Sequence, residues 1–476
     1  MQYLSSYHFL SFIGFLAHAI IYSNFNVYLY CQMSKIGTAI DTFWVAREWL
    51  RLESSRFLPT KKRQKNDGQH VCLFAWALPP NSNAGVYRPL SFIRYGTELG
   101  WRFDCFQGEV PENSREHGEE LLAHIPIGTA LHVVAKSSRE PSFLWSPEID
   151  GGFKNALKNA GYAIERLRYD PPDVVIASGP PFYVFVAAYF VAKWFGVPLV
   201  LDYRDEWTEC PFDFVSIGRH DQYWERRCLV SADAVLFTTQ SHLDHQLSCF
   251  PELVKQRAYL VPNGWEPNDF AYDCGEHRKS TNFGSKIFNL AHIGSLGGHN
   301  LPHDFLGALE ALLTDEPLWR ERLVVHFVGR RSPEAANALN LFPFKDNLRI
   351  VGHVGKQEAN RLMMEADCLL LIAVPNLARY LPGKLFDYVA SLRPILVFGS
   401  PGEASSVVEL LGNGLLCQPG SRDRLAECLK ILSDSGGNLC TSVVDHWLSN
   451  HRRERLARTV FQIIDSLLIC NKSSHK

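Results

Sequence analysis

Short apolar runs alternate with longer helical segments from Val71 onward. Runs that are apolar on both faces predict parallel strands in a sheet covered by helices on both sides. The segment FYVFVAAYFVAKWFG (182–196) is one of the predicted covering helices. The predicted strands of the first half are VCLFAW (71–76), RFDCF (102–106), LHVVA (131–135), DVVIAS (173–178), PLVLDY (198–203), DAVLFT (233–238) and AYLVP (258–262).

A polar stretch at 266–286 interrupts this alternation, and its many turn formers predict a linker between domains. The alternation then restarts, and a helix-like stretch at 446–468 closes the chain. The predicted strands of the second half are KIFNLAHIG (286–294), RLVVHFVG (322–329), NLRIVG (347–352), DCLLLIA (367–373), PILVFG (394–399) and GLLC (414–417).

The pattern therefore predicts an α/β protein with two tandem, doubly wound Rossmann-like domains that face a cleft. We place an N-terminal extension at 1–69 and an acceptor-side domain at 70–275. A donor-binding domain follows at 276–450, and a C-terminal helix and tail occupy 451–476.

The N-terminal extension holds two apolar segments. No charged side chain precedes Lys35, and residues 9–23 are strongly apolar but shorter than the ~20 residues of a spanning helix. A basic cluster follows at 61–65, so an inserted segment would leave the main body in the cytosol. The segment is either such an anchor or a peripheral extension. Residues 36–57 are either an interfacial helix or a helix packed on the main body.

Composition narrows the function classes. The 476 residues carry 48 basic and 50 acidic side chains, a net charge of −2, so no global field attracts nucleic acid. The 12 cysteines are scattered, without a CxxC pair or the spacing of a zinc site. Cysteines within apolar runs predict buried, reduced thiols in a cytosolic protein.

Three loops after strands of the first half carry candidate chemistry. PPNSNAGVYRP (79–89) places Gly85 and Arg88 where a strand turns into a helix, which suits an anion or is a plain turn. In ASGPPFYVF (177–185), Ser178 and Gly179 either form a polar rim of the cleft or cap the next helix. In LDYRDEWT (201–208), Arg204 either contacts a ligand or braces the loop.

Asp205 in the same loop is the candidate base for an acceptor hydroxyl. The alternative is a carboxylate that pairs with Arg204 and only stabilises the loop. Four charged side chains after an apolar strand are not needed for packing, which favours a role in the cleft.

The first loop of the second half, HIGSLGGHN (292–300), is rich in glycine. The backbone N–H groups of Gly294, Ser295, Gly297 and Gly298 suit a phosphate. The loop is not GxGxxG, so a nicotinamide dinucleotide is disfavoured. His299 is either a donor to a phosphate or an exposed loop histidine.

The segment VPNLARYLPGKLFDYVASLRPIL (374–396) is the richest in candidate chemistry. Lys384 falls in the first turn of a predicted helix that begins near Gly383, and Asp387 lies three residues later on nearly the same face. The lysine suits a diphosphate and the carboxylate suits ribose hydroxyls, whereas the alternative is an ordinary ion pair. In SPGEASSVVEL (400–410), Ser405 and Ser406 are either phosphate donors or a helix cap.

Together these segments resemble a bacterial branch of the glycosyltransferase family 4-like proteins of the GT-B superfamily, over roughly residues 71–432. LDYRDEWT is similar to the family's RDPW segment, VPNGWEPNDF to its PNG(Y/V)D…F hinge, and LPGKLFDYVASLRPIL to GKLFEYLAAGRPIL in its E-x7-E region. The resemblance implies transfer of a sugar from a nucleoside diphosphate donor to a glycan or lipid-linked acceptor, usually with retention.

The resemblance also implies no metal and no cofactor, since the nucleotide-sugar is a substrate. It places Asp387 at the ribose and Lys384 near the donor. The predicted catalytic residues are Asp205, His299 and Lys384. The predicted donor site is Gly294, Ser295, Gly297, Gly298, Lys384, Asp387, Ser405 and Ser406, and the predicted acceptor side is Gly85, Arg88, Ser178, Gly179 and Arg204.

Two positions depart from the family pattern. Arg379 stands where the family has the first glutamate, which touches the transferred sugar, and His299 stands where many relatives have an arginine. A weakened, nucleotide-sugar-binding protein and a sugar-nucleotide epimerase of the same fold therefore stay open as alternatives.

Overall fold

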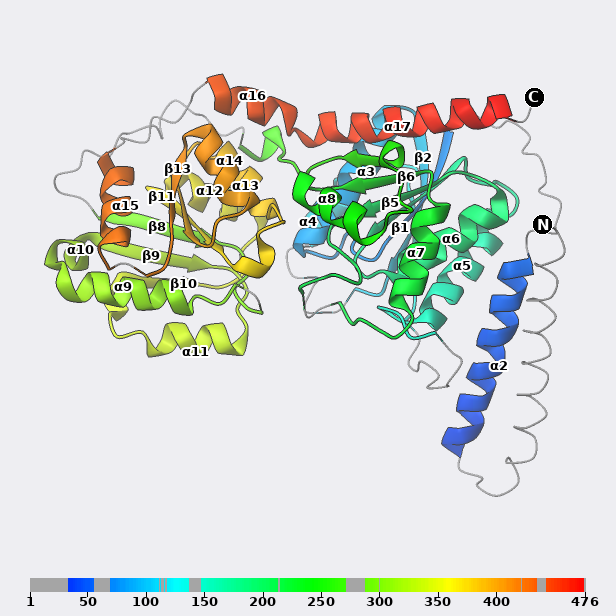
Figure 1. Cartoon of the computed structure of the whole chain (residues 1–476), viewed down its shortest axis with the longest axis horizontal. Coiled ribbons are helices and arrows are strands. Elements are labelled where there is room, and N and C mark those ends of the chain that lie inside the picture. Colours follow the sequence, from blue (N-terminus) through cyan, green and yellow to red (C-terminus); the bar gives the residue numbers. More distant parts are fainter. Residues whose placement is uncertain are drawn as a thin grey trace.

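The computed structural model contains two parallel sheets, each covered by helices (Figure 1). It describes residues 33–54, 69–110, 112, 115, 118–136, 147–212, 215–270, 287–298, 300–420, 422–434 and 442–474. Each sheet lies within one of the two predicted Rossmann-like domains, which we call the first and second domain.

The first domain has a seven-stranded sheet with the order β3-β2-β1-β4-β5-β6-β7. β2 and β3 are added on one side of β1, and β4 to β7 are added on the other side. The strand order thus reverses between β1 and β4, which is the point at which ligands bind in such sheets. The strands are β1 (Gln69–Ala75), β2 (Trp101–Gly108), β3 (Ala130–Val134), β4 (Val174–Gly179), β5 (Leu199–Tyr203), β6 (Ala234–Phe237) and β7 (Ala258–Leu260). The helices are η2 (Ala84–Val86), α3 (Tyr87–Glu98), α4 (Glu119–Leu122), α5 (Phe153–Leu167), α6 (Tyr183–Phe195), α7 (Asp221–Ser231), α8 (Gln240–Cys249) and η4 (Lys255–Arg257).

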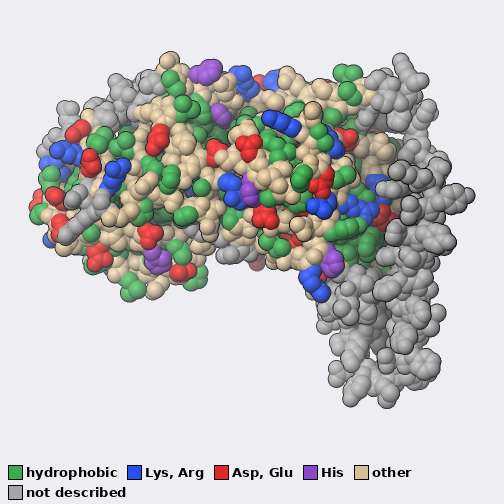
Figure 2. Space-filling model, viewed as in Figure 1, with side chains coloured by type: hydrophobic (Ala, Val, Ile, Leu, Met, Phe, Trp, Pro, Cys, Tyr) green, Lys and Arg blue, Asp and Glu red, His purple; other side chains and the backbone are tan. Residues whose placement is uncertain are grey.

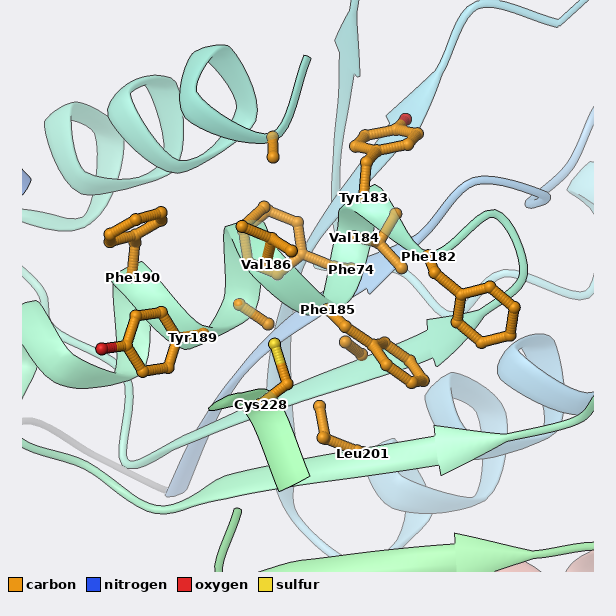
Figure 3. Packing of buried hydrophobic residues seen from close by; sticks show 14 of the residues in the cluster. Phe74, Phe182, Tyr183, Val184, Phe185, Val186, Tyr189, Phe190, Leu201 and Cys228 are labelled. Carbon is orange, nitrogen blue, oxygen red and sulfur yellow. The ribbon is translucent and has the colours of Figure 1, made fainter. Parts of the chain in front are cut away.

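Helix α6 confirms the predicted apolar helix and forms the centre of the first core. Its residues 183–192 are all buried, since the sheet covers one side and other helices cover the rest. Figure 3 shows Phe185 and Val186 of α6 among Phe74 of β1, Leu201 of β5 and Cys228 of α7. This packing fixes the carboxyl ends of β1, β4 and β5, from which the site loops emerge.

The second domain has a six-stranded parallel sheet with the order β10-β9-β8-β11-β12-β13. Its strands are β8 (Phe288–Ile293), β9 (Leu323–Val328), β10 (Leu348–Val351), β11 (Cys368–Ala373), β12 (Ile395–Gly399) and β13 (Gly414–Cys417). Its helices are α9 (His303–Asp315), α10 (Pro317–Arg322), α11 (Pro333–Leu341), η6 (Lys345–Asn347), α12 (Lys356–Glu365), η7 (Pro375–Leu377), α13 (Gly383–Ala390), α14 (Glu403–Leu411) and α15 (Arg422–Asp434). Separate apolar cores lie on the two faces of this sheet.

The predicted closing helix is in fact two helices, α16 (Ser442–Asn450) and α17 (Arg453–Ser474). Helix α16 packs on the second domain, where Trp447 stacks on Phe386 with ring centroids 5.2 Å apart. Helix α17 returns to the first domain, where Phe461 packs on Trp101 at 5.2 Å. The two helices therefore run along one side of both domains (Figure 1).

The chain crosses between the domains at two places that lie side by side. The first crossing contains η5 (Pro267–Phe270), and the second joins α16 to α17. Trp265 Nε1 donates to the carbonyl of Leu448 at 2.8 Å, and the backbone of Trp265 forms an isolated parallel β-bridge with that of Arg452. A Cβ on Gly264 would lie 2.5 Å from the carbonyl oxygen of His451, so glycine is needed for this close approach.

Helix α2 (Met33–Glu53) resolves one alternative for the N-terminal extension. Val45 and Leu52 are fully buried, and Trp49 packs on Phe153 at 5.1 Å. Glu53 forms ion pairs of 2.5 Å with Lys193 and with Arg227. The C-terminal half of this helix is thus packed on the main body.

The apolar segment 9–23 and the basic cluster at 61–65 lie outside the described residues. Within the described ranges, no helix combines the length and the apolar character needed to cross a bilayer. Figure 2 shows cationic and anionic side chains interspersed over the face in view, in keeping with the nearly balanced charge of the chain.

Candidate functional site

A cavity of about 890 Å³ lies between the two domains. The first domain lines it with the loops after β1, β5, β6 and β7, and the second with the loops after β8, β9, β10, β11 and β12. The carboxyl ends of both sheets therefore open onto one space, as expected for doubly wound domains.

Lys384 lines this cavity from the first turn of α13, the helix predicted to begin near Gly383. Its Nζ lies 3.2 Å from Nε2 of His292, and Nδ1 of His292 lies 3.1 Å from the carbonyl of Leu370. That carbonyl can only accept, so His292 carries its proton on Nδ1 and accepts from the lysine at Nε2. Burial, with the lysine beside it, holds the pKa of His292 well below its usual value, which keeps the ring neutral.

Partial burial also lowers the pKa of Lys384, to about 8. Lys384 forms no ion pair with a carboxylate in the part of the chain that the structure describes. The alternative, an ordinary ion pair between Lys384 and Asp387, is therefore not present in the structure. A cation without an opposing carboxylate, in the wall of a cavity, suits an anionic ligand.

The glycine loop after β8 lies against Lys384. A Cβ on Gly294, whose φ is 141°, would be 2.7 Å from Nζ of Lys384, so any larger residue would displace the lysine. Gly294, Ser295, Gly297 and Gly298, the loop residues of the predicted donor site, all line the cavity. Asn300 holds the loop, since Oδ1 accepts from Gly297 N at 3.1 Å and Nδ2 donates to Ser295 O at 2.9 Å. His299 lies outside the described residues.

Arg330 is a second cation in the cavity wall and was not among the residues predicted for the site. It follows β9, and its carbonyl accepts from the N–H of Leu296 at 2.9 Å, which places it beside the glycine loop. Its Nη2 donates to the hydroxyl of Ser82 in the first domain at 2.9 Å. The available signal was its position directly after the apolar run 322–329.

Asp387 lines the cavity one turn after Lys384. One oxygen, Oδ2, accepts from Nζ of Lys356 at 2.5 Å. The other oxygen, Oδ1, accepts no hydrogen bond from the described residues. A buried carboxylate oxygen without a donor is unfavourable, so a hydroxyl of a ligand would stabilise it.

The two serines after β12 differ in position. Ser405 lines the cavity, but its hydroxyl exchanges hydrogen bonds of 3.0 Å with the N–H and carbonyl of Gly402 and caps α14. Ser406 lies on α14 away from the cavity wall. The capping alternative therefore describes Ser405, and Ser406 does not line the cavity.

On the predicted acceptor side, the two arginines support the loops that form the cavity wall. Arg88 pairs with Asp202 at 2.8 Å and donates to the carbonyl of Pro262 at 2.7 Å. Arg204 donates to the carbonyls of Gly85, Gly179 and Pro180 at 2.8, 3.0 and 2.6 Å. Both line the cavity, yet their guanidinium groups are engaged by the protein.

The three small residues of the predicted acceptor side have structural explanations. Gly85 lines the cavity, and a Cβ on it would lie 2.2 Å from Nη1 of Arg204. A glycine at this position therefore leaves room for the arginine side chain. Ser178 is buried and donates to Asp202 at 2.7 Å. Ser178 and Gly179 do not line the cavity, which favours the structural alternative for this loop.

Asp205 lines the cavity on the side of the first domain. Burial raises its pKa to about 6, although the neighbouring Arg204 opposes the shift. A carboxyl group with that pKa is mostly ionised at neutral pH and can take up a proton readily.

Arg379, the departure from the family pattern, does not line the cavity, although Ala378 and Tyr380 on either side of it do. Its guanidinium instead contacts Glu206 of the first domain at 3.0 and 2.6 Å. The position therefore contributes no carboxylate to the cavity.

Residues 288–435 match the family model of the glycosyl transferases group 1. The similarity to this family therefore covers most of the second domain and about a third of the whole chain. The matched range contains the glycine loop, Arg330, Lys384 and Asp387 of this domain. No curated protein matches the chain as a relative.

Three solved structures resemble the chain over both of its domains. Sucrose-phosphate synthase from Thermosynechococcus elongatus has 13% identity and a TM-score of 0.62, covering 84% of this chain and 100% of that one. A glycosyltransferase from Rickettsia africae has 14% identity and a TM-score of 0.61, covering 85% and 99%. HepE from Anabaena, in complex with UDP-glucose, has 12% identity and a TM-score of 0.60, covering 83% and 99%. The chain thus has the two-domain GT-B fold, as predicted.

Proposed function

We propose that this protein transfers a sugar from a nucleoside diphosphate sugar to a glycan or lipid-linked acceptor in the cavity between its domains. The observation that carries the proposal is Lys384, a cation set into the cavity wall of the second domain without an opposing carboxylate among the described residues. A diphosphate supplies the negative charge that this position lacks.

The donor diphosphate would lie between Lys384, Arg330 and the amides of the glycine loop. The first turn of α13 adds the partial positive charge of a helix N-terminus. UDP and UDP-glucose are bound in structures of HepE, which has the same fold, and this supports a nucleotide-sugar as the donor here.

Asp387 would bind the ribose. Lys356 holds one carboxylate oxygen and thereby orients the side chain, and Oδ1 remains for a ribose hydroxyl. This arrangement leaves the lysine of the same helix turn, Lys384, for the diphosphate.

Catalysis would follow from charge stabilisation at the leaving group. Negative charge grows on the diphosphate as the glycosidic bond breaks, and cations already in place lower the free energy of that state. Asp205 would take the proton of the acceptor hydroxyl from the opposite wall. We expect retention at the anomeric carbon, which requires the acceptor oxygen to form its bond on the same face of the sugar that the diphosphate leaves.

Nucleoside diphosphate release tests the proposal. The protein is incubated with UDP-glucose and other nucleotide-sugars, with and without candidate acceptors, and released diphosphate is measured. Lys384→Met should abolish most of the release, whereas Lys430→Met, which removes an exposed lysine of α15, should leave it unchanged. Full release by Lys384→Met would refute the assignment.

The engagement of Arg379 away from the cavity favours one alternative, a protein that binds nucleotide-sugar without transferring it. Binding of UDP with no diphosphate release, for every donor and acceptor offered, would support that alternative. Release that needs no acceptor would instead indicate an epimerase.

A further inference from the structure

Arg379 and Glu206 form an ion pair that joins the two domains. Arg379 precedes α13 in the second domain, and Glu206 follows β5 in the first. Nε and Nη2 of the arginine donate to Oε1 and Oε2 of the glutamate at 3.0 and 2.6 Å. A two-point contact of this kind fixes orientation as well as distance.

Glu206 is enclosed by further donors. Its side chain has 0% exposure, Tyr380 donates to it at 2.9 Å, and Nδ1 of His245 lies 2.7 Å from it. Burial by itself would raise the pKa of Glu206, but Arg379 and the nearby histidine His242 hold it below its usual value. The carboxylate is therefore charged, and the arginine that pairs with it belongs to the other domain.

The start of α8 adds further contacts between the same two domains. The hydroxyl of Thr239 donates to the carbonyl of Arg379 at 2.6 Å. The hydroxyl and N–H of Ser241 donate to Oε1 of Glu403 at 2.5 and 3.1 Å. We call these residues the interdomain clamp: Glu206, Thr239 and Ser241 of the first domain with Arg379, Tyr380 and Glu403 of the second.

The clamp is built from the same loops as the cavity wall. Asp205 lines the cavity, and the next residue, Glu206, belongs to the clamp. In the second domain, Ala378 and Tyr380 line the cavity on either side of Arg379, and the ring of Tyr380 packs 5.3 Å from that of Phe212. A displacement of Arg379 relative to Glu206 would therefore move the cavity walls contributed by both domains.

We propose that Arg379 and Glu206 are positioning residues, which hold the two walls of the cavity together and set Asp205 against the donor domain. The arginine in place of the family's sugar-facing glutamate thus acts on the geometry of the cavity and not on the sugar. The kinetic consequence rests on the proposed function, whereas the contact between the domains does not.

The ion pair lies between the domains, so a role in holding them together can be distinguished from a role in stabilising one of them. Both residues lie in loops outside the helices and strands, and the side chain of Arg379 is 35% exposed. Loss of the pair should therefore leave both domains folded and change their arrangement. A residue that only stabilised one domain would give the opposite result.

Three variants and one control test the clamp. Arg379→Gln removes the cation, and Arg379→Lys keeps the charge but loses the two-point contact. The double variant Arg379→Gln/Glu206→Gln removes both charges, so no buried carboxylate is left without its partner. The control is Arg361→Gln, because Arg361 is an exposed arginine of α12 that pairs with Glu358 and Glu365 of its own helix.

Small-angle scattering, UDP titration and steady-state kinetics are compared across these proteins. We expect a larger radius of gyration for Arg379→Gln and for the double variant than for the control, with circular dichroism unchanged. Because misplacement of reacting groups by about 1 Å can cost about 100-fold in rate, kcat should fall by that order. UDP affinity should match the control, and Arg379→Lys should give an intermediate kcat.

Equal radii of gyration for the double variant and the control would overturn the clamp. A kcat equal to that of the control would overturn the positioning role, and a loss of UDP affinity confined to the Arg379 variants would make Arg379 a donor ligand instead. If the unaltered protein turns over no nucleotide-sugar, the proposed function fails, while the radius of gyration still decides whether the clamp exists.

Discussion

The pH dependence of nucleoside diphosphate binding should report directly on Lys384. In the free protein, partial burial lowers the pKa of this lysine to about 8, since the hydrogen bond to neutral His292 does not compensate a buried charge. A bound diphosphate would favour the charged form and return the pKa toward the ordinary lysine value of ~10. The pKa is thus higher in the complex than in the free protein.

The sign and size of the effect follow from this difference. Below pH 7 the lysine is charged in both states, so affinity should be independent of its titration. As pH rises through 8, the free protein loses the charge that the complex keeps, and affinity falls. At pH 9 only about one tenth of free Lys384 is charged, so Kd should be about 10-fold weaker than at pH 7, or about 1.4 kcal/mol.

Calorimetric titration with UDP at pH 7, 8 and 9 measures this loss. The terminal phosphate of UDP, with a pKa of about 6, is already ionised over this range. Lys384→Met should bind weakly at all three values and show no such slope. A wild-type Kd that is constant from pH 7 to 9, or an equal slope in Lys384→Met, would refute the reasoning.

Three further predictions concern other residues. Arg330→Gln should weaken UDP binding about 10- to 100-fold, since a charged hydrogen bond is worth roughly 1.5–3 kcal/mol, and calorimetry against the Arg361→Gln control checks this. Asp205→Asn should lower kcat about 10²- to 10⁴-fold without changing UDP affinity, and an unchanged kcat would exclude it as the base. Phe461→Ala should lower the free energy of unfolding by about 3–5 kcal/mol, because this ring is 1% exposed and packs on Trp101. Urea denaturation measures the loss, and a loss below about 1 kcal/mol would contradict that packing argument.

Local pattern was sufficient for the elements that carry the site. Each predicted strand from VCLFAW to GLLC overlaps a strand of the structure, because short apolar runs between helical segments are typical of buried parallel strands. Gly383 begins α13, and Lys384 reaches the cavity, since the proline before it and the helical spacing after it define the first turn. The glycine loop after β8 also lies where its position after a strand predicted.

Side chains whose partners are distant in the chain were not predictable in this way. His292 reads as part of an apolar strand, and its role depends on Lys384, 92 residues later. Arg88 and Arg204 were candidate ligand groups, but their partners are Asp202 and four carbonyls that the fold brings together. The break between α16 and α17 depends on the return of the chain to the first domain.

The sequence by itself determined the two sheets, the loops at their carboxyl ends and the basic group in the first turn of α13. These follow from hydrophobic periodicity and turn formers, which act over a few residues. Only the tertiary structure decided that Arg379 faces Glu206 across the domains, 173 residues apart, and that Arg330 joins Lys384 at the cavity. A charged side chain in a loop can satisfy its hydrogen bonds in many ways, and the choice among them depends on which surface the other domain places against it.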